Sequence, residues 1–141
     1  MKRAAFLLAV LTALAGCSSA VGVVPQEQPA QSQAALVDRL YMGRSIPGGG
    51  TVSDADWKRF VDEYVTPRFP DGLTVFSAQG QWREGDGTII AESTFVLEFI
   101  HAGGAAAERA VREIAAEYKR RFRQMAVLHT RAAVRMTVLQ Q

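Results

Sequence analysis

A short segment in the middle of the chain constrains the fold most, because it must end one element, reverse direction and begin another. Residues 66–82 read TPRFPDGLTVFSAQGQW. Pro67 disfavours a continuing helix and pushes Thr66 away from helical angles. The proline–aspartate–glycine run at 70–72 has the composition of a tight turn, and residues 73–76 have that of a strand. The segment therefore predicts a helix before residue 66 and a strand after the turn.

The chain on both sides of this segment predicts a single α+β domain over residues 36–141. Ser53 is placed to cap a helix in which apolar residues recur at helical spacing. The expected elements, in chain order, are a strand at 36–44, a helix at 53–65, strands at 73–82 and 88–100 joined by a glycine-bearing hairpin loop, a helix at 105–123, and a strand at 126–139. This β-α-β-β-α-β order is typical of the ferredoxin-like sandwich, an antiparallel sheet with two helices on one face.

Alternation along the expected strands assigns residues to the two faces of the sheet. We expect one core, formed by apolar residues of both helices and of the strand at 88–100: Trp57, Phe60, Tyr64, Phe95, Leu97, Ile114 and Tyr118. We expect the opposite face to be mixed and charged, with Glu92, Glu98, His129, Arg131 and Arg135. An open face of this kind can pair with a second copy of the chain, giving a homodimer, or receive a ligand.

The amino terminus has the pattern of an export signal. A positive start, Met1-Lys2-Arg3, precedes an apolar run at residues 4–14 that is too short to span a bilayer as a mature helix. The run ends in Leu14-Ala15-Gly16-Cys17, which resembles the lipobox of bacterial lipoproteins, where the cysteine is lipidated and the chain is cut just before it. We therefore expect residues 1–16 to be a lipoprotein signal peptide. An ordinary secreted protein with an incidental cysteine is the alternative.

Lipidation would give the chain a membrane anchor at Cys17. This is the only cysteine, so no intrachain disulfide can form, and several acyl chains such as palmitate make anchoring stable. Residues 17–35 then read as the lipidated cysteine followed by a disordered tether rich in Ser, Gln, Ala and Pro. Ser18 stands where enterobacterial sorting signals for inner-membrane retention have Asp. By that resemblance we expect the bacterial cell envelope, on the periplasmic side of the outer membrane.

The charge balance argues against nucleic acid as a partner. The chain has 16 basic and 14 acidic residues, and residues 1–16 contribute two of the basic ones and no acid. Without that segment, 16 − 2 = 14 basic residues balance 14 acidic ones, and a neutral domain lacks the basic footprint of a nucleic-acid-binding protein. His101 and His129 lack zinc-ligand spacing, and the glycines at 48–50 are not followed by a phosphate-loop lysine. We expect no metal and no cofactor.

Three runs of the sequence carry a family resemblance. They are LYMGRSIPGG, VSDADWKRFVDEYVTPRFPDGLTVFSAQGQWRE and IIAESTFVLEFI, and the TPRFPDGLTV and GQW parts are distinctive. On these runs the chain, from about residue 36 to its end, resembles the bacterial domain of unknown function 3574 family. Members are often described as lipoproteins or exported proteins. The resemblance implies no substrate, cofactor or mechanism.

Four polar residues lie within these runs among turn and core residues: Arg44, Arg68, Gln81 and Glu92. We expect their side chains to converge near the start of the strand at 73–82, either satisfying one another or facing a ligand. The favoured function is a membrane-anchored envelope lipoprotein that binds a small ligand or a partner. The alternative is a small periplasmic enzyme with an acid–base site built from Arg and Glu, although the chain has no nucleophile elbow and no catalytic cysteine.

Overall fold

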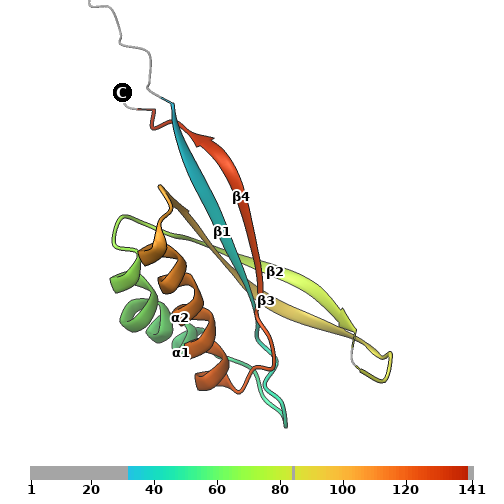
Figure 1. Cartoon of the computed structure of the whole chain (residues 1–141). Coiled ribbons are helices and arrows are strands. Elements are labelled where there is room, and N and C mark those ends of the chain that lie inside the picture. The colour runs from blue at the N-terminus through green and yellow to red at the C-terminus, as the bar shows by residue number, and fades with distance from the viewer. Residues whose placement is uncertain (1–31, 84, 140–141) are drawn as a thin grey trace, which may run out of the picture.

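Four antiparallel strands form one sheet, and both helices pack on the same face of it (Figure 1). The computed structural model describes residues 32–83 and 85–139. The elements are β1 (Gln33–Gly43), α1 (Asp54–Phe60), η1 (Val61–Val65), η2 (Thr66–Arg68), β2 (Thr74–Arg83), β3 (Ile89–His101), α2 (Ala105–Phe122) and β4 (Leu128–Met136). The sheet order is β2-β3-β1-β4, which confirms the predicted ferredoxin-like α+β fold. Two arms, one formed by β1 and β4 and one by β2 and β3, extend beyond the helices (Figure 1).

The amino-terminal boundary of the fold differs from the prediction. β1 starts at Gln33, so residues 33–35 of the predicted tether belong to the sheet. They pair with Val134, Arg135 and Met136 of β4, and these ladder hydrogen bonds hold residues of low strand propensity in extended form. The predicted signal peptide, Cys17 and the rest of the predicted tether lie outside the described residues. Within the described part of the chain, no helix is both long enough and apolar enough to cross a membrane.

The first helical segment changes its winding before the turn. Ser53 caps α1 as predicted, because its hydroxyl accepts the Asp56 N–H at 3.1 Å. The chain then continues as a π-helical turn, η1, and a 3-10 turn, η2. Thr66 keeps helical angles (φ −54°, ψ −43°), contrary to the prediction, since Pro67 enters the first turn of η2, where its missing N–H costs little. The turn that follows needs Gly72, whose φ is 136°.

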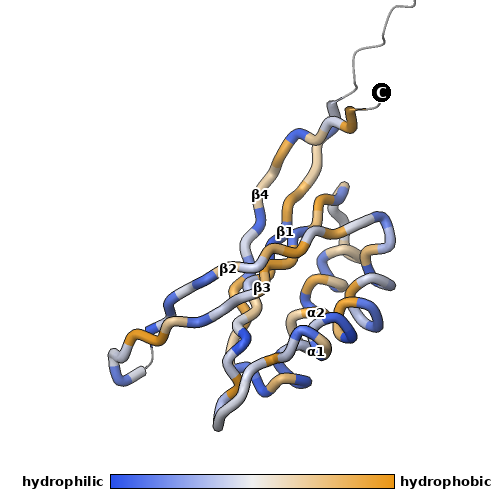
Figure 2. The backbone as a smooth tube through the Cα atoms, turned by 180° about the vertical axis from the view of Figure 1, so that it is seen from behind, coloured by the Kyte–Doolittle hydropathy of each residue, from blue (hydrophilic) through white to orange (hydrophobic). Residues whose placement is uncertain are grey.

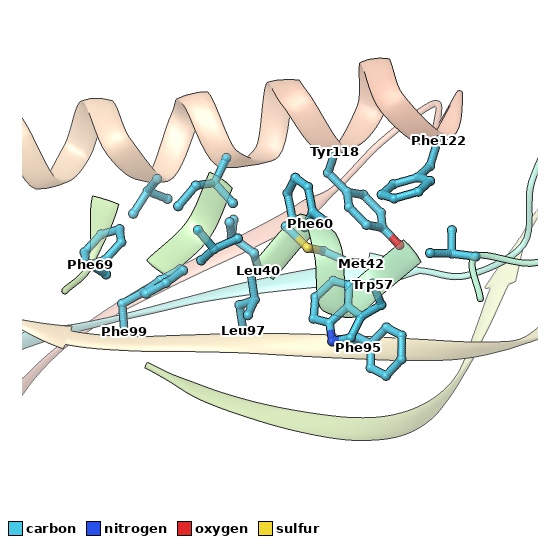
Figure 3. Close-up of a cluster of buried hydrophobic side chains, with 14 residues drawn as sticks. Leu40, Met42, Trp57, Phe60, Phe69, Phe95, Leu97, Phe99, Tyr118 and Phe122 are labelled. Atoms are coloured by element: carbon cyan, nitrogen blue, oxygen red, sulfur yellow. The ribbon is translucent and has the colours of Figure 1, made fainter. Parts of the chain in front are cut away.

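Aromatic side chains fill most of the space between the helices and the sheet (Figure 3). Trp57 of α1 stacks on Phe95 of β3 with ring centroids 4.2 Å apart, and Phe60 meets Tyr118 of α2 edge-on at 5.3 Å. The Tyr118 hydroxyl donates to the Gly43 carbonyl at 3.0 Å, so this buried polar atom is satisfied. The predicted core is confirmed, with Tyr64 partly rather than fully buried.

The face of the sheet opposite the helices differs from the prediction. Residues paired across antiparallel strands point to the same side, and His129 pairs with Leu40 while Arg131 pairs with Asp38. Since Leu40 is part of the core, His129 and Arg131 lie on the helix-facing side and not on the open side. Arg135 pairs with Ala34, which has the same parity as Leu40, so the prediction is wrong for Arg135 as well. Alternation separates the two sets of β4 residues but does not say which set faces the helices.

The open side is largely apolar, and we call it the bare face. By register it carries these residues: Gln33, Ala35, Val37, Arg39, Tyr41 and Gly43 of β1; Thr74, Phe76, Ala78, Gly80 and Trp82 of β2; Ile90, Glu92, Thr94, Val96, Glu98 and Ile100 of β3; and Leu128, Thr130, Ala132, Val134 and Met136 of β4. Glu92 and Glu98 are there as predicted. Figure 2, seen from behind, shows apolar segments on both arms.

Candidate functional site

A carboxylate on the central strand β1 is the only fully buried charged group among the described residues. Asp38 has no exposed surface. Its Oδ2 lies 2.7 Å from Nε2 of His101, and its Oδ1 lies 2.6 Å from Nε2 of His129. Arg131 donates to both oxygens, from Nε at 2.8 Å and from Nη2 at 3.0 Å. With Glu108, which accepts from Arg131 Nη1 at 2.8 Å, these residues form what we call the Asp38 cluster.

The sheet register brings these residues together from both neighbours of β1. On one side, β3 pairs His101 with Leu36, two residues from Asp38 and on the same face. On the other side, β4 places Arg131 directly opposite Asp38 and His129 opposite Leu40. Residues two apart on a strand share a face, so three strands direct polar side chains at one point. Glu108, in the first turn of α2, joins the cluster from the helix layer by accepting a hydrogen bond from Arg131.

Hydrogen bonding determines the charge of the cluster. Burial opposes ionisation of Asp38, but the hydrogen bonds from Arg131, His129 and His101 outweigh it and hold the pKa of that carboxyl well below its usual range. Hydrogen bonds to Asp38 and Glu108 raise the pKa of Arg131 above its ordinary value. The carboxylate is therefore ionised, and the guanidinium covers both of its oxygens.

The two histidines of the cluster differ in what their second ring nitrogen does. Nδ1 of His101 accepts the Gly103 N–H at 3.0 Å, so Nε2 carries the proton that it donates to Asp38. The His101 side chain is 12% exposed and that of His129 is 38% exposed. Within the described residues no hydrogen bond is recorded for Nδ1 of His129. Only His129 therefore has a nitrogen to offer to a ligand.

Each histidine borders a different hollow. The first, of about 220 Å³, lies between α2 and β4 and is lined by five residues of α2 together with Leu40 and His129; we call it the α2–β4 hollow. The second, of about 320 Å³, is lined by residues 68–72, residues 100–103, Ala106 and Ala107; we call it the turn hollow. The buried carboxylate thus lies between two surface depressions, with one histidine toward each.

Two of the predicted site residues lie at the other end of the core. Arg44 donates to the Val52 carbonyl from Nε at 2.9 Å and from Nη2 at 2.7 Å, and pairs with Asp54 at 2.8 Å. Glu92 accepts the Ser45 N–H at 2.9 Å. Both side chains already have protein partners, and they hold the loop that follows β1.

The other two predicted residues do not join them. Arg68 donates to the Tyr64 carbonyl at 2.9 Å and to Glu113 at 3.2 Å, and it borders the turn hollow near His101. His101 ends β3, whereas Glu92 lies near the start of β3, nine residues or about 30 Å away along the extended strand. Gln81 is exposed on the arm formed by β2 and β3. The four residues therefore do not converge: the length of β3 separates Arg68 from Glu92, and Gln81, which pairs with Ala91, faces the opposite side of the sheet from Glu92.

The Asp38 cluster was absent from the sequence-based prediction, which found no zinc-ligand spacing for His101 and His129 and placed His129 on the open face. The signal was available in β1, where Asp38 has the same parity as the core residues Leu40 and Met42. A carboxylate at a core-facing position needs charged or hydrogen-bonding partners. Within the described residues, no group of three or more His, Cys, Asp or Glu side chains is arranged to hold a metal.

Comparison with known proteins supplies a family and confirms the fold. Residues 37–138 match the family described as a protein of unknown function (DUF3574), and the chain belongs to that family. No curated protein matches the chain.

Two solved structures of phage SAM lyase are similar in fold. The complex with S-methyl-5'-thioadenosine has a TM-score of 0.59 at 14% identity, and the match covers 74% of this chain and 90% of the lyase chain. The apo structure has a TM-score of 0.53 at 14% identity, covering 77% of this chain and 93% of the lyase chain. At this identity the similarity concerns the fold alone.

Proposed function

We propose that this protein is a lipid-anchored module of the bacterial cell envelope that binds a second copy of itself through the bare face of its sheet. One observation carries the proposal: large apolar side chains lie exposed on that face. Phe76 is 46% exposed, Ile100 47% and Leu128 56%. Both helices lie on the other side of the sheet (Figure 1), so within the described residues no element covers these side chains. By register, one polar row that includes the Arg39–Glu98 pair separates Phe76 and Leu128 from Ile100. Large apolar side chains exposed on an uncovered face of a sheet favour an interaction site there.

The charges on the bare face favour a second copy over a partner of one charge sign. Arg39 pairs with Glu98 at 2.5 Å, and Glu92 is held by the Ser45 N–H. No other charged residue lies on the bare face by register. A two-fold contact brings the same patch from both copies together, so a nearly neutral patch meets itself without strong repulsion.

The dimensions of the bare face are compatible with a modest two-fold interface. Strands lie about 4.8 Å apart and rise about 3.3 Å per residue, so ladders of eight to ten residue pairs cover roughly 500 Å² before side-chain relief is added. Standard interfaces bury about 800 Å² per partner. Two copies anchored in one membrane would also meet at a higher effective concentration than two free copies.

The membrane anchor rests on the sequence pattern that ends in Cys17. Cys17→Ala should release the processed domain from the membrane fraction or leave the signal uncut, because the thiol that receives the lipid is gone. Fractionation of the envelope, followed by mass spectrometry of the amino terminus, measures both outcomes. Ser18→Asp is a suitable companion, since it should move the protein toward the inner membrane if the sorting resemblance holds. A Cys17→Ala protein that fractionates like the parent contradicts the anchor.

The enzyme alternative has less support from the geometry. An acid–base site needs groups that are free to meet a substrate, and Arg44 and Glu92 are bound to the backbone of their own loop. The similarity to SAM lyase supplies a direct check, which is to add S-methyl-5'-thioadenosine to the protein and look for binding.

Self-association can be tested with a pair of neighbouring residues on β2. Phe76 lies on the bare face, while Val75, 39% exposed, lies on the other side of the same strand. Phe76→Glu should weaken the dimer by at least tenfold, because it places like charges in the contact, and Val75→Glu should not. Sedimentation of the full chain in detergent measures both. A parent protein that stays monomeric, or equal effects of the two changes, would contradict the proposal.

A further inference from the structure

We propose that the α2–β4 hollow is a binding site for a phosphate group, held by His129, Arg112 and Lys119. The inference goes beyond the self-association proposed above and uses the opposite side of the sheet. All three side chains line the hollow. Phosphate prefers Arg, Lys and imidazole donors, which match its several acceptor oxygens.

Small residues create the space. Arg112, Ala115, Ala116 and Lys119 follow one another at i, i+3, i+4 and i+7 along α2, which places them on one face of the helix. The two alanines leave room between the helix and β4, while the two cations stand at either end of the same stripe. The volume of about 220 Å³ accommodates a phosphate group with a small substituent or a few waters, and is below the range of about 300–1,000 Å³ that is usual for larger ligands.

Neither Arg112 nor Lys119, the two cations that line the hollow, forms a short ion pair with a carboxylate among the described residues. Arg112 has Glu108 as its recorded carboxylate partner, at 3.8 Å, and its side chain is 70% exposed. Glu108 makes its shorter contact, 2.8 Å, with Arg131. No ion pair is recorded for Lys119 among the described residues. Two positive charges are therefore available at the rim of the hollow.

His129 is held in place by the Asp38 cluster. Its Nε2 points to the ionised carboxylate of Asp38, as the 2.6 Å contact shows, and its ring borders the hollow. A histidine whose one nitrogen is fixed by a carboxylate presents the other in a defined orientation. That nitrogen can accept a hydrogen bond from a protonated phosphate oxygen.

The charged groups around the His129 ring come from three elements: Asp38 from β1, Arg131 from β4, and Arg112, Lys119 and Glu108 from α2, with His101 of β3 on the far side of Asp38. Of these, Arg112 and Lys119 line the hollow itself, so a phosphate bound there lies against positive charge.

The protein contains its own control for this test. It has two histidines, both bonded to Asp38, and only His129 borders the α2–β4 hollow. Inorganic phosphate added to the full chain in a phosphate-free detergent should shift the ring resonances of His129 saturably and leave those of His101 nearly unchanged. About 10 mM phosphate would saturate a site of millimolar affinity. Equal shifts of both rings would overturn the proposal.

Substitutions on α2 separate a site from a general charge effect. The double change Arg112→Ala and Lys119→Ala should weaken phosphate binding by about tenfold or more. The matched double change Arg109→Ala and Arg120→Ala removes the same charge from α2 residues that do not line the hollow, and should leave binding within about twofold. Ala116→Leu fills the hollow without altering charge and should also abolish the His129 shift. Equal weakening by both double changes would contradict a built site.

The source of the phosphate is distinguished by a second arm. Full chain placed in phosphatidylglycerol nanodiscs, with no soluble phosphate, reports binding of a lipid headgroup through the same His129 resonances. A shift there and not with inorganic phosphate identifies a membrane phosphodiester, and the reverse identifies a soluble phosphate. Either result requires the site. An unchanged His129 in both arms rejects it.

Discussion

Each face of the sheet carries one group of residues whose chemical character is expected on the other face. The side covered by helices contains a buried ionic cluster around Asp38, whereas the side facing outward carries Phe76, Ile100 and Leu128. On β4 this inversion occurs within a single strand, because His129 and Arg131 point inward and Leu128 points outward. The difference shows that ion pairing can determine which set of side chains on a strand faces the helices. Because His129 and Arg131 bond to Asp38 on the helix-facing side, the alternate, apolar residues of β4 must face the open side.

The largest expected effect comes from removing the charge inside. Asp38→Asn keeps the shape of the side chain but leaves Arg131 and two histidines without their carboxylate. We expect a loss of about 3 kcal/mol in the free energy of unfolding, since breaking a buried ion pair on one side is costly. Urea unfolding measures it. The control is Asp62→Asn, which removes an exposed partner of Lys58 and should change stability by less than about 0.5 kcal/mol. Equal losses for the two variants would show that the cluster is not a stabilising feature.

The same comparison depends on pH. The folded pKa of Asp38 lies below that of an unfolded Asp, so the carboxylate stabilises the fold fully above the unfolded value of about 3.9 and loses this effect as pH falls toward the folded pKa. The stability difference between the parent and Asp38→Asn should therefore be constant above about pH 5 and shrink below about pH 4. Urea titrations across this range measure it. A difference that grows in acid would mean that the pKa shift has the opposite sign.

An intermediate effect is expected where the bare face is most crowded. A Cβ added at Gly43 would overlap the carboxylate of Glu92, so Gly43→Ala should displace that carboxylate from the Ser45 N–H and cost about 1–2 kcal/mol. At Gly80, also on the bare face, the nearest atom would be Oγ1 of Thr94 at 3.7 Å, so Gly80→Ala should be neutral or slightly stabilising. Thermal unfolding of both variants makes the comparison. Gly80→Ala as harmful as Gly43→Ala would show that packing against Glu92 is not the cause.

The smallest effect is expected from Glu92 itself. Glu92→Gln keeps an acceptor for the Ser45 N–H and removes only its charge, so we expect a loss of about 0.5–1 kcal/mol. The change should be additive with Asp38→Asn, because the two sites lie at opposite ends of the core. A double-mutant cycle in urea measures both quantities. A coupling above about 0.5 kcal/mol would mean that the two ends communicate.

The fold was predictable from local patterns, and the candidate site was not. Helical spacing of Trp57 and Phe60, and alternation through Phe95 and Leu97, are local signals that survive in the structure. The helix after Phe60 was harder to predict, because Pro67 is accommodated by rewinding into η1 and η2. Local propensity describes what a residue prefers and does not describe how neighbouring turns adjust to it.

The site depends on register, which a single sequence does not reveal. Arg44, Arg68, Gln81 and Glu92 were grouped because they are polar residues among turn and core residues of the same motif runs, but an extended strand places Arg68 and Glu92 far apart. His101 and His129 are separated by 28 positions in the sequence (129 − 101 = 28) and meet at one carboxylate through two different strand pairings. Asp38 was the available clue, since a buried acid requires partners even when their identity is unknown.

The position of β1 in the sheet determines how the domain would respond to mechanical force. β1 is an inner strand, with eight residues paired to β3 and nine to β4. Its first residue, Gln33, is the end of the strand that is nearer in sequence to the predicted anchor at Cys17. Antiparallel hydrogen bonds run perpendicular to the strands. A pull along β1 from its amino terminus would therefore load both ladders in shear, with many bonds sharing the tension at once. An edge strand pulled away from its end would instead lose its bonds one at a time. If the chain is anchored at Cys17 as proposed, the pulling force would therefore act on the strand best placed to resist it.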